Sequence, residues 1–160
     1  MRYLTTIILF IFFIPTANGQ IDYLEKFKTH KFPCDKDSTT AAINICSGIQ
    51  RKYADSLMNV AYLNILNSLT KNILVNRNKL KNEISKKGKK NIKLQIIYNK
   101  QLLKSIIKSQ KKWIALRYWN TRVANVDPWN GIARAAMENY SFIDETLERI
   151  RKLQEFDIGK

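Results

Sequence analysis

Between Thr40 and Leu69, apolar side chains recur at helical intervals along the chain. Residues spaced by three, four or seven positions lie on one face of an α-helix. The positions of this stripe are Ile43, Cys46, Tyr53, Leu57, Ala61, Ile65 and Leu69. The hydroxyls of residues 38–40 can cap its start. We therefore expect a first long helix from about Thr40 to about Leu69.

A second helical pattern follows a Lys-rich connection. Ser85 to Lys90 contains Gly88, and we expect the chain to break there. The apolar positions that can line the inner side of the next helix are Ile92, Ile96, Tyr98, Leu102, Ile106, Trp113, Leu116 and Trp119. This pattern predicts a second long helix from about Asn91 to about Val123.

A third pattern follows Asp127 to Gly131, which has the composition of a turn. We expect a helix from about Ala133 to about Phe156. Its stripe is Met137, Tyr140, Ile143, Leu147, Ile150 and Leu153. No long stretch alternates with the period of two that indicates a strand. The sequence thus predicts an all-α fold, an antiparallel bundle of about three long helices.

The first nineteen residues have the three parts of a secretory signal peptide. Arg2 supplies a positive charge, Leu4 to Ile14 is apolar, and small residues flank Asn18. The apolar run is shorter than the roughly 20 residues that span a bilayer; a permanent N-terminal anchor is the alternative. We expect a signal peptide at 1–19, an arm at 20–33, a helical domain at 34–156, and a secreted or periplasmic location.

Two cysteines are present, Cys34 and Cys46. In an exported protein such a pair normally forms a disulfide. A zinc site would need more ligands than these two thiols and His30 supply. We therefore expect an N-terminal disulfide and no metal or other cofactor.

Positive charge is concentrated in the middle of the chain. Without residues 1–19 the chain has 27 Lys or Arg and 13 Asp or Glu, a formal net charge of +14. Fourteen of these cations and a single acid lie between Lys71 and Lys112, and the field of such a segment attracts polyanions and acidic partners. A Lys-rich composition encoded by an AT-rich genome is the other explanation. The densest basic patch is Lys86, Lys87, Lys89, Lys90 and Lys93.

Catalytic motifs are missing from the sequence. His30 is the single histidine, so neither a Ser–His–Asp nor a Cys–His set can be built around a folded pocket. There is no Gly-rich phosphate loop. A hydrolase that uses only carboxylates remains conceivable, but the acids are scattered. We expect a binding protein and no enzyme.

Two polar patterns fall on the first two long helices. Asp55, Asn59 and Tyr62 share one side of the first helix. Gln110, Trp113 and Arg117 share one side of the second. We expect one interhelical network in which Arg117 pairs with Asp55, because the guanidinium fork matches a carboxylate. A ligand site is the alternative.

These residues resemble the LprI-type lysozyme-inhibitor family over roughly Phe32 to Leu153. The resemblance rests on order and spacing together. Its first motifs run Pro33-Cys34-Asp35-Lys36, Thr39 to Cys46, and Tyr53-Ala54-Asp55-Ser56-Leu57-Met58-Asn59 with Tyr62. Its later motifs are Gln110, Trp113 and Arg117, then Thr146, Arg149 and Leu153.

The sequence departs from the family pattern in three places. Thr121 and Ser141 stand where the family usually has two further cysteines. The joint absence of these two cysteines is what the loss of one disulfide would look like, and it supports pairing of Cys34 with Cys46. The family's Gly-rich loop is replaced by Asn125 to Gly131. The Lys-rich segment at 71–91 is longer and more basic than the usual connector.

The resemblance implies an exported protein that binds and blocks lysozyme. An inhibitor must occlude a cleft that holds two carboxylates. We expect the loop from Asn125 to Gly131 to enter it with Trp129 as the buried anchor; packing of Trp129 onto the bundle is the alternative. The candidate binding residues are Asn125, Asp127, Trp129 and Asn130.

Charge argues against the simplest form of this hypothesis. Many animal lysozymes are basic, and a protein of charge +14 is repelled by them at long range. A target that is an acidic wall hydrolase would not be repelled in this way. The alternatives are immunity against a periplasmic toxin, or binding of a polyanion or anionic envelope surface through Lys71 to Lys112. Nucleic acid is disfavoured, because that segment has only Tyr98 for stacking on bases.

Overall fold

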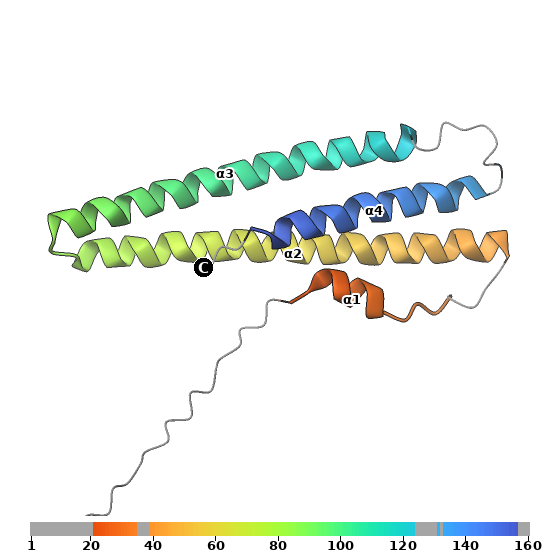
Figure 1. Ribbon diagram of the computed structural model, residues 1–160, viewed down its shortest axis with the longest axis horizontal. Helices are drawn as coiled ribbons and strands as arrows, with labels where there is room; N and C mark the ends of the chain where they lie inside the picture. The colour runs from red at the N-terminus through yellow and green to blue at the C-terminus, as the bar shows by residue number, and fades with distance from the viewer. Residues whose placement is uncertain (1–20, 35–38, 124–130, 132, 157–160) are drawn as a thin grey trace, which may run out of the picture.

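The protein is an antiparallel helical hairpin covered by a third long helix. The computed structural model describes residues 21–34, 39–123, 131 and 133–156. Within these ranges there are four helices and no strand, namely α1 (Tyr23–Thr29), α2 (Thr40–Asn82), α3 (Lys86–Val123) and α4 (Arg134–Gln154). α2 and α3 form the hairpin, and α4 lies along one half of it (Figure 1). The predicted all-α bundle with three long helices is confirmed.

The predicted signal peptide lies outside the described residues. Among the helices that the structure describes, none combines the length and the apolar character needed to cross a membrane.

α2 begins as predicted but continues far beyond Leu69. The Oγ1 atom of Thr39 accepts a hydrogen bond from the backbone N–H of Ala42 at 3.2 Å and so caps the helix. The helix runs on to Asn82 because residues 70–82 contain no Gly or Pro. Ile73, which is 7% exposed, extends the buried stripe one turn past Leu69. The sequence prediction ended this helix too early.

The reversal between α2 and α3 was predicted at the wrong residues. The chain turns at residues 83–85, and Gly88 lies in the first turn of α3. Ser85 caps α3, because its Oγ accepts the N–H of Gly88 at 3.3 Å. The Glu83 carboxylate accepts the N–H of Ser85 at 2.9 Å. A Cβ at position 88 would lie 2.5 Å from Cδ of Glu83, so glycine at this position lets the Glu83 carboxylate approach the backbone. Gly88 does not break the helix, contrary to the sequence prediction.

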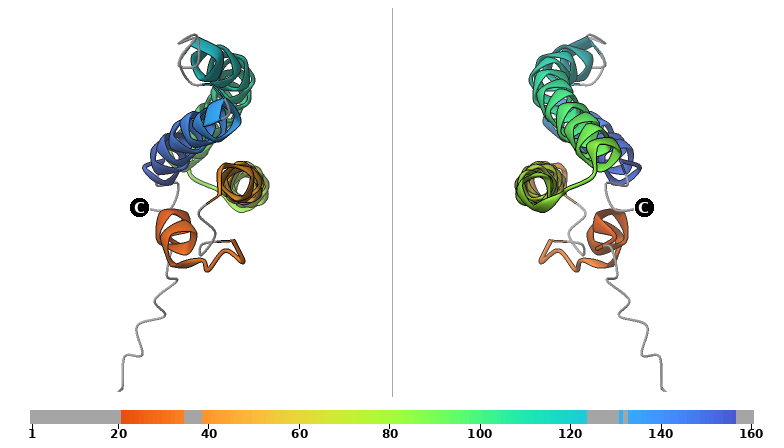
Figure 2. Two further views of the ribbon diagram at one scale, coloured as in Figure 1. Left: turned by 90° about the vertical axis from the view of Figure 1, so that its right-hand side faces the viewer. Right: turned by 90° about the vertical axis from the view of Figure 1, so that its left-hand side faces the viewer.

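The core is formed where α4 lies on the hairpin. In Figure 2, viewed along the long axis, α2 lies to one side of α3 and α4, which overlap in this view, and α1 lies beside α2. One buried cluster contains Tyr23, Leu57, Met58, Ala61 and Ile150. A second buried cluster contains Ile65, Leu69, Ile106 and Leu153. Both clusters combine α2 with α4, which makes α2 the central helix of the bundle.

The segment expected as an arm contains the short helix α1. Asp22 caps it by accepting the N–H groups of Leu24 and Glu25, at 2.9 and 3.2 Å. These bonds, foremost that from Glu25, hold the pKa of Asp22 below its usual range. Tyr23 is 6% exposed and belongs to the core, and its hydroxyl accepts a hydrogen bond from Asn64. A helix of seven residues is too short for its periodicity to stand out in the sequence.

Three apolar residues assigned to the inner side of α3 point outward instead. Tyr98, Leu116 and Trp119 are 63%, 56% and 61% exposed. Trp113 and Trp119 are six residues apart, about one and two-thirds helical turns, so they cannot share one face. In this part of α3 the buried side is the one that carries Arg117. The sequence pattern predicted Arg117 and Trp113 on one side of the helix.

The first turns of α4 are also rotated from the predicted stripe. Met137 and Tyr140 are exposed, and Ala136 is buried in their place. The backbone N–H of Ala136 donates to Oδ1 of Asn44 at 3.0 Å. An α2 side chain thus satisfies one of the free N–H groups at the start of α4.

Candidate functional site

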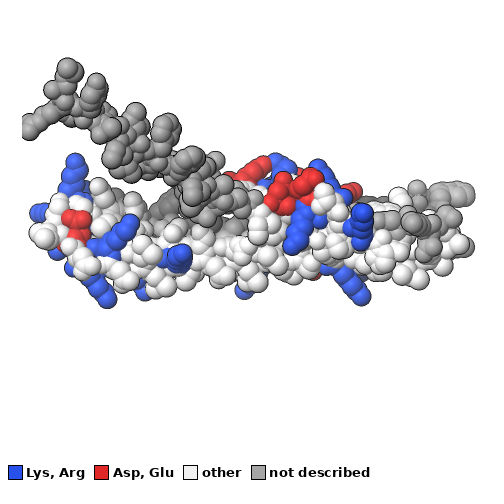
Figure 3. Space-filling model, turned by 90° about the horizontal axis from the view of Figure 1, so that it is seen from below, with Lys and Arg blue, Asp and Glu red and all other residues white. Residues whose placement is uncertain are grey.

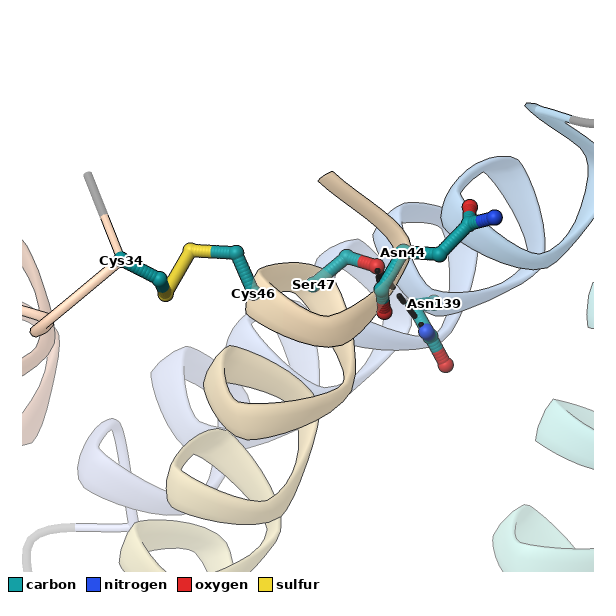
Figure 4. The surroundings of a disulfide bond; sticks show 5 residues. All are labelled: Cys34, Asn44, Cys46, Ser47 and Asn139. Atoms are coloured by element: carbon teal, nitrogen blue, oxygen red, sulfur yellow. Dashed lines mark hydrogen bonds between the residues drawn. A yellow bond between two sulfur atoms is a disulfide. The ribbon is translucent and has the colours of Figure 1, made fainter. Parts of the chain in front are cut away.

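A disulfide braces the N-terminal end of the bundle. Cys34 and Cys46 are joined by an S–S bond of 2.08 Å, with their Cα atoms 5.4 Å apart (Figure 4). Ser47, the next residue on α2, is fully buried, and its Oγ accepts a hydrogen bond from Asn139 of α4 at 3.0 Å. The disulfide therefore joins α2 to the preceding segment, and the bond between Ser47 and Asn139 joins α2 to α4. This disulfide was predicted from the sequence.

Arg117 of α3 links all three long helices. Its NH1 group donates to Oδ1 of Asp55 on α2 at 2.6 Å and to Oγ1 of Thr146 on α4 at 2.9 Å. The side chain of Arg117 is 8% exposed and that of Asp55 is 38% exposed. Burial lowers the pKa of Arg117 from its usual value, and the hydrogen bond that Arg117 donates to Asp55 opposes this shift. The pairing expected from the sequence is present as a mostly buried ion pair.

Aromatic rings surround the same guanidinium. The Cζ atom of Arg117 lies 3.8 Å from the ring centroid of Phe142 and 4.3 Å from that of Trp113. Arg51 of α2 also lies over Phe142, at 3.9 Å. Ring faces attract guanidinium groups, and more strongly when both are shielded from water. Trp113 thus belongs to this cluster, together with Phe142, which the sequence analysis did not single out.

Gln110 forms a second polar link about two turns before Arg117 on α3. Its Oε1 accepts from Nε of Arg149 on α4 at 2.9 Å, and its Nε2 donates to Sδ of Met58 on α2 at 2.9 Å. Arg149 also donates to Oγ of Ser109 at 2.9 Å. Burial lowers the pKa of Arg149. The family motif residues on α3 thus meet those on α4 in the interior.

Two residues expected in this network have other surroundings. Asn59 is exposed, and no described hydrogen bond joins it to Asp55 or Arg117. Tyr62 is half-buried and packs against both core clusters. The structure therefore brings together Asp55, Gln110, Trp113 and Arg117 but leaves Asn59 at the surface.

Hydrogen bonds stand where the family's second pair of cysteines is missing. Thr121 is buried, and its Oγ1 donates to the backbone carbonyl of Arg117 at 2.8 Å. Near it, Asn120 of α3 donates to Glu145 of α4 at 2.9 Å. The bond from Asn120 to Glu145 joins α3 to α4 without a covalent link, whereas the bond of Thr121 stays within α3.

No metal-binding group of three or more His, Cys, Asp or Glu side chains occurs in the described ranges. His30 stacks on Tyr53, with ring centroids 4.1 Å apart, and lies edge-on to Phe32 at 4.6 Å. The histidine is thus part of an aromatic cluster beside α2.

Thr146, whose hydroxyl accepts from Arg117, donates to the carbonyl of Phe142 at 2.6 Å. The polar groups described here join helices and form no arrangement of nucleophile and base.

The predicted basic patch lies at the far end of the hairpin. Lys86, Lys87, Lys89, Lys90 and Lys93 are exposed on the first two turns of α3. Figure 3 shows this end on the left, where cationic side chains lie around a small acidic area. The patch is thus far from the network around Arg117.

The predicted binding loop lies outside the described residues, with Asn125, Asp127, Trp129 and Asn130. The last turns of α3, which lead into this segment, expose an apolar and aromatic surface. We call it the α3 patch: Leu116, Tyr118, Trp119, Arg122 and Val123. The rings of Tyr118 and Trp119 meet edge to face, with centroids 5.4 Å apart. The sequence pattern did not indicate this patch, because Leu116 and Trp119 were predicted to lie inside the bundle.

Together these features define a class, a disulfide-braced helical scaffold whose buried polar residues hold helices together. The chain belongs to the LprI family, since the family described as "Lysozyme inhibitor LprI" matches residues 34–153. The match contains the disulfide, the Arg117 network and the α3 patch, and it confirms the resemblance seen in the sequence. Comparisons with curated proteins and with solved structures found no match. A family of inhibitors is consistent with a role in binding and not in catalysis.

Proposed function

We propose that this protein is exported and blocks a lysozyme or a related cell-wall hydrolase by covering its active-site cleft. The observation that carries the proposal is the family match over residues 34–153, which includes every long helix of the bundle. The signal-like residues 1–19 and the Cys34–Cys46 disulfide support an exported, oxidising setting.

The α3 patch is the surface best suited to hold a protein partner. Trp, Tyr and Arg are the residue types that most often dominate binding energy at interfaces. Here Trp119 is 61% exposed beside Tyr118, and Arg122 donates to the hydroxyl of Tyr118 at 2.5 Å. These contacts restrict the side chains before binding, which lowers the entropy lost on association.

Arg122 and the segment at 124–130 supply the part that would enter the cleft. A glycosidase cleft holds two carboxylates, and a guanidinium is the side chain that pairs best with them. Arg122 is exposed one turn beyond Tyr118 and two positions before residue 124. In this proposal the α3 patch packs on the rim, while Arg122 and Trp129 approach the carboxylates.

The distribution of charge reduces the objection from long-range repulsion. Lys93 and Trp119 are 26 positions apart on one helix, a distance of about 40 Å at 1.5 Å per residue. The Debye length at physiological ionic strength is about 8 Å, so the lysines of the basic patch are screened from a partner at the α3 patch. Residues 113–160 contain seven basic and seven acidic residues. A basic lysozyme therefore remains a candidate beside an acidic one.

The proposal is tested by the lysis of cell-wall suspensions. We expect stoichiometric purified protein to slow at least one enzyme from a panel of animal and bacterial lysozymes. Trp119→Ala should weaken this inhibition about 30-fold or more, as expected for a hot-spot Trp. Trp129→Ala tests the neighbouring segment in the same assay.

Tyr98→Ala is the matched control, because Tyr98 is an equally exposed aromatic residue on the same helix but far from the α3 patch. Its potency should equal that of the unmodified protein. If no lysozyme is slowed at micromolar protein, inhibition is excluded for this family member. Equal loss in Tyr98→Ala and Trp119→Ala would exclude the α3 patch as the contact surface.

A further inference from the structure

The hairpin formed by α2 and α3 projects beyond the rest of the bundle. α4 ends at Gln154, near the buried cluster of Leu69, Ile106 and Leu153. Beyond that point, of the helices that the structure describes, only α2 and α3 continue side by side (Figure 1). We call residues 77–94 the hairpin tip. Because no other described helix covers it, the tip is free to meet an external surface.

Exposed apolar side chains lie at the extreme end of the tip. Ile84, between the two helices, is 93% exposed, and Leu94 is 55% exposed. Both line a shallow groove of about 480 Å³ together with Lys86, Lys89, Lys90 and Lys93. An isoleucine with almost no contact contributes little to folding by burial. Its position is therefore explained better by a contact outside the chain.

The charge of the tip is unfavourable for the isolated protein. Residues 77–93 contain eight Lys or Arg and one acid, Glu83. Five of the lysines lie on the first two turns of α3, where the helix dipole is positive and lysines are disfavoured. The first turn of α3 contains no acidic residue. An external anion would relieve the repulsion among these charges.

We propose that the hairpin tip docks on an anionic lipid bilayer. The lysines of the groove would contact the lipid phosphates, while Ile84 and Leu94 enter the interface between headgroups and acyl chains. A dissolved polyanion would satisfy the lysines but offers no apolar phase to Ile84. The combination of both kinds of residue in one groove therefore favours a membrane surface over a soluble polyanion. The contact is peripheral and spans no membrane.

Docking by the tip is compatible with a free α3 patch. The two surfaces lie at opposite ends of α3, about 40 Å apart by helical rise. A protein docked through the tip would hold the α3 patch away from the bilayer. The inference stands on the tip alone, so its failure leaves the proposed inhibition untouched, and the inhibition assay needs no lipid.

The test is sedimentation of the purified mature protein, without the proposed signal peptide at 1–19, with phosphatidylcholine vesicles that contain or lack phosphatidylglycerol. We expect binding only when phosphatidylglycerol is present. A variant with Lys86, Lys89, Lys90 and Lys93 all changed to Gln should bind at least 100-fold more weakly, since each Lys near an anionic surface contributes about fivefold. Ile84→Ser should weaken binding about tenfold, because it removes the side chain that enters the interface.

Matched controls separate the tip from general charge. Changing Lys100, Lys104, Lys108 and Lys111 to Gln removes the same charge from exposed positions of α3 outside the groove. Ile45→Ser removes an isoleucine that is 65% exposed at the other end of α2. Both controls should bind far better than the corresponding tip variants. Circular dichroism checks that each variant keeps its helices, and Ile84→Asn serves as a second substitution at the tip.

Three outcomes would overturn the inference. Equal losses from the two sets of lysine changes would show adsorption by net charge alone. Unchanged binding of Ile84→Ser and Ile84→Asn would show that no side chain enters the interface, as for a soluble polyanion. Equal binding to vesicles without phosphatidylglycerol, or binding to neither, would exclude an anionic bilayer as the partner.

Discussion

Arg117 shows at residue scale how a buried charge is accommodated in this bundle. Removing a guanidinium from water costs several kcal/mol unless new partners replace the water. Here the partners are Asp55, Thr146 and the rings of Trp113 and Phe142. Asp55 is the only one of the four that carries a charge, so the cost of burying Arg117 depends mainly on this carboxylate.

We predict that Asp55→Ala lowers the free energy of unfolding by about 2 kcal/mol. The substitution leaves the Arg117 charge buried without its counterion. Because the Asp55 side chain is 38% exposed, water can replace it in part, and the loss stays below that of a fully buried pair. Urea denaturation followed by circular dichroism measures the change.

Arg151 provides the control for this prediction. It pairs with Glu148 at 2.7 Å and with Glu155 on the exposed face of α4. The hydrogen bond from Arg151 holds the pKa of Glu148 at about 2, but exposed pairs contribute little to stability. Arg151→Ala should therefore leave the free energy of unfolding almost unchanged. A loss in Asp55→Ala no larger than that in Arg151→Ala would contradict the role given to the Arg117 network.

At the scale of elements, α2 is the axis of the molecule. Its 43 residues span about 65 Å, and it contributes to both core clusters. Gly48 lies inside this helix, although glycine destabilises a helix interior because it loses the most conformational freedom on folding. A Cβ built at Gly48 would lie 3.8 Å from Nδ2 of Asn139, which is an ordinary contact distance. The structure therefore has room for a methyl group there.

We predict that Gly48→Ala raises the free energy of unfolding by about 0.5–1 kcal/mol, the usual gain in a helix interior. Thermal denaturation and urea denaturation both measure this change. Gly88→Ala is the matched control on α3, because its Cβ would lie 2.5 Å from Cδ of Glu83. The Glu83 side chain would have to move and lose its bond to Ser85. We expect no gain in Gly88→Ala, and equal gains in both variants would contradict this account of Gly88.

At the scale of the whole molecule, the disulfide determines how well the N-terminal end is held. The bond between Cys34 and Cys46 closes a loop with a sequence separation of 12. In the chain-entropy treatment, a loop of this size stabilises the folded state by about 3 kcal/mol. α1 and the aromatic residues around Tyr53 lie near this end of the bundle. Reduction should therefore loosen α1 before the long helices.

We predict that changing both Cys34 and Cys46 to Ser lowers the free energy of unfolding by about 3 kcal/mol. Urea denaturation with and without dithiothreitol measures the effect. The unmodified protein should lose the same amount when reduced, and the double variant should not respond to the reductant. A reductant effect in the double variant would show that the loss has another origin.

Much of this architecture could be predicted from local pattern. Helical periodicity indicated the three long helices, and the exported setting indicated the pairing of Cys34 with Cys46. The pairing of Asp55 with Arg117 was inferred from the polar residues that share one side of each helix and from the match of a guanidinium to a carboxylate. Such inferences succeed because a helix repeats its inward positions at a fixed interval.

The packing of the helices decided which of their side chains are buried and which are exposed. Whether Trp119 or Arg117 faces the interior depends on how α3 is rotated against α2 and α4, and hydrophobicity alone favours the tryptophan. The short α1 is stable through burial of Tyr23 against the bundle, which no local pattern contains. The exposure of Ile84 follows from α4 ending before the hairpin does. Periodicity thus specifies which residues form helices, while the rotation and relative length of packed helices specify which side chains remain at the surface for binding.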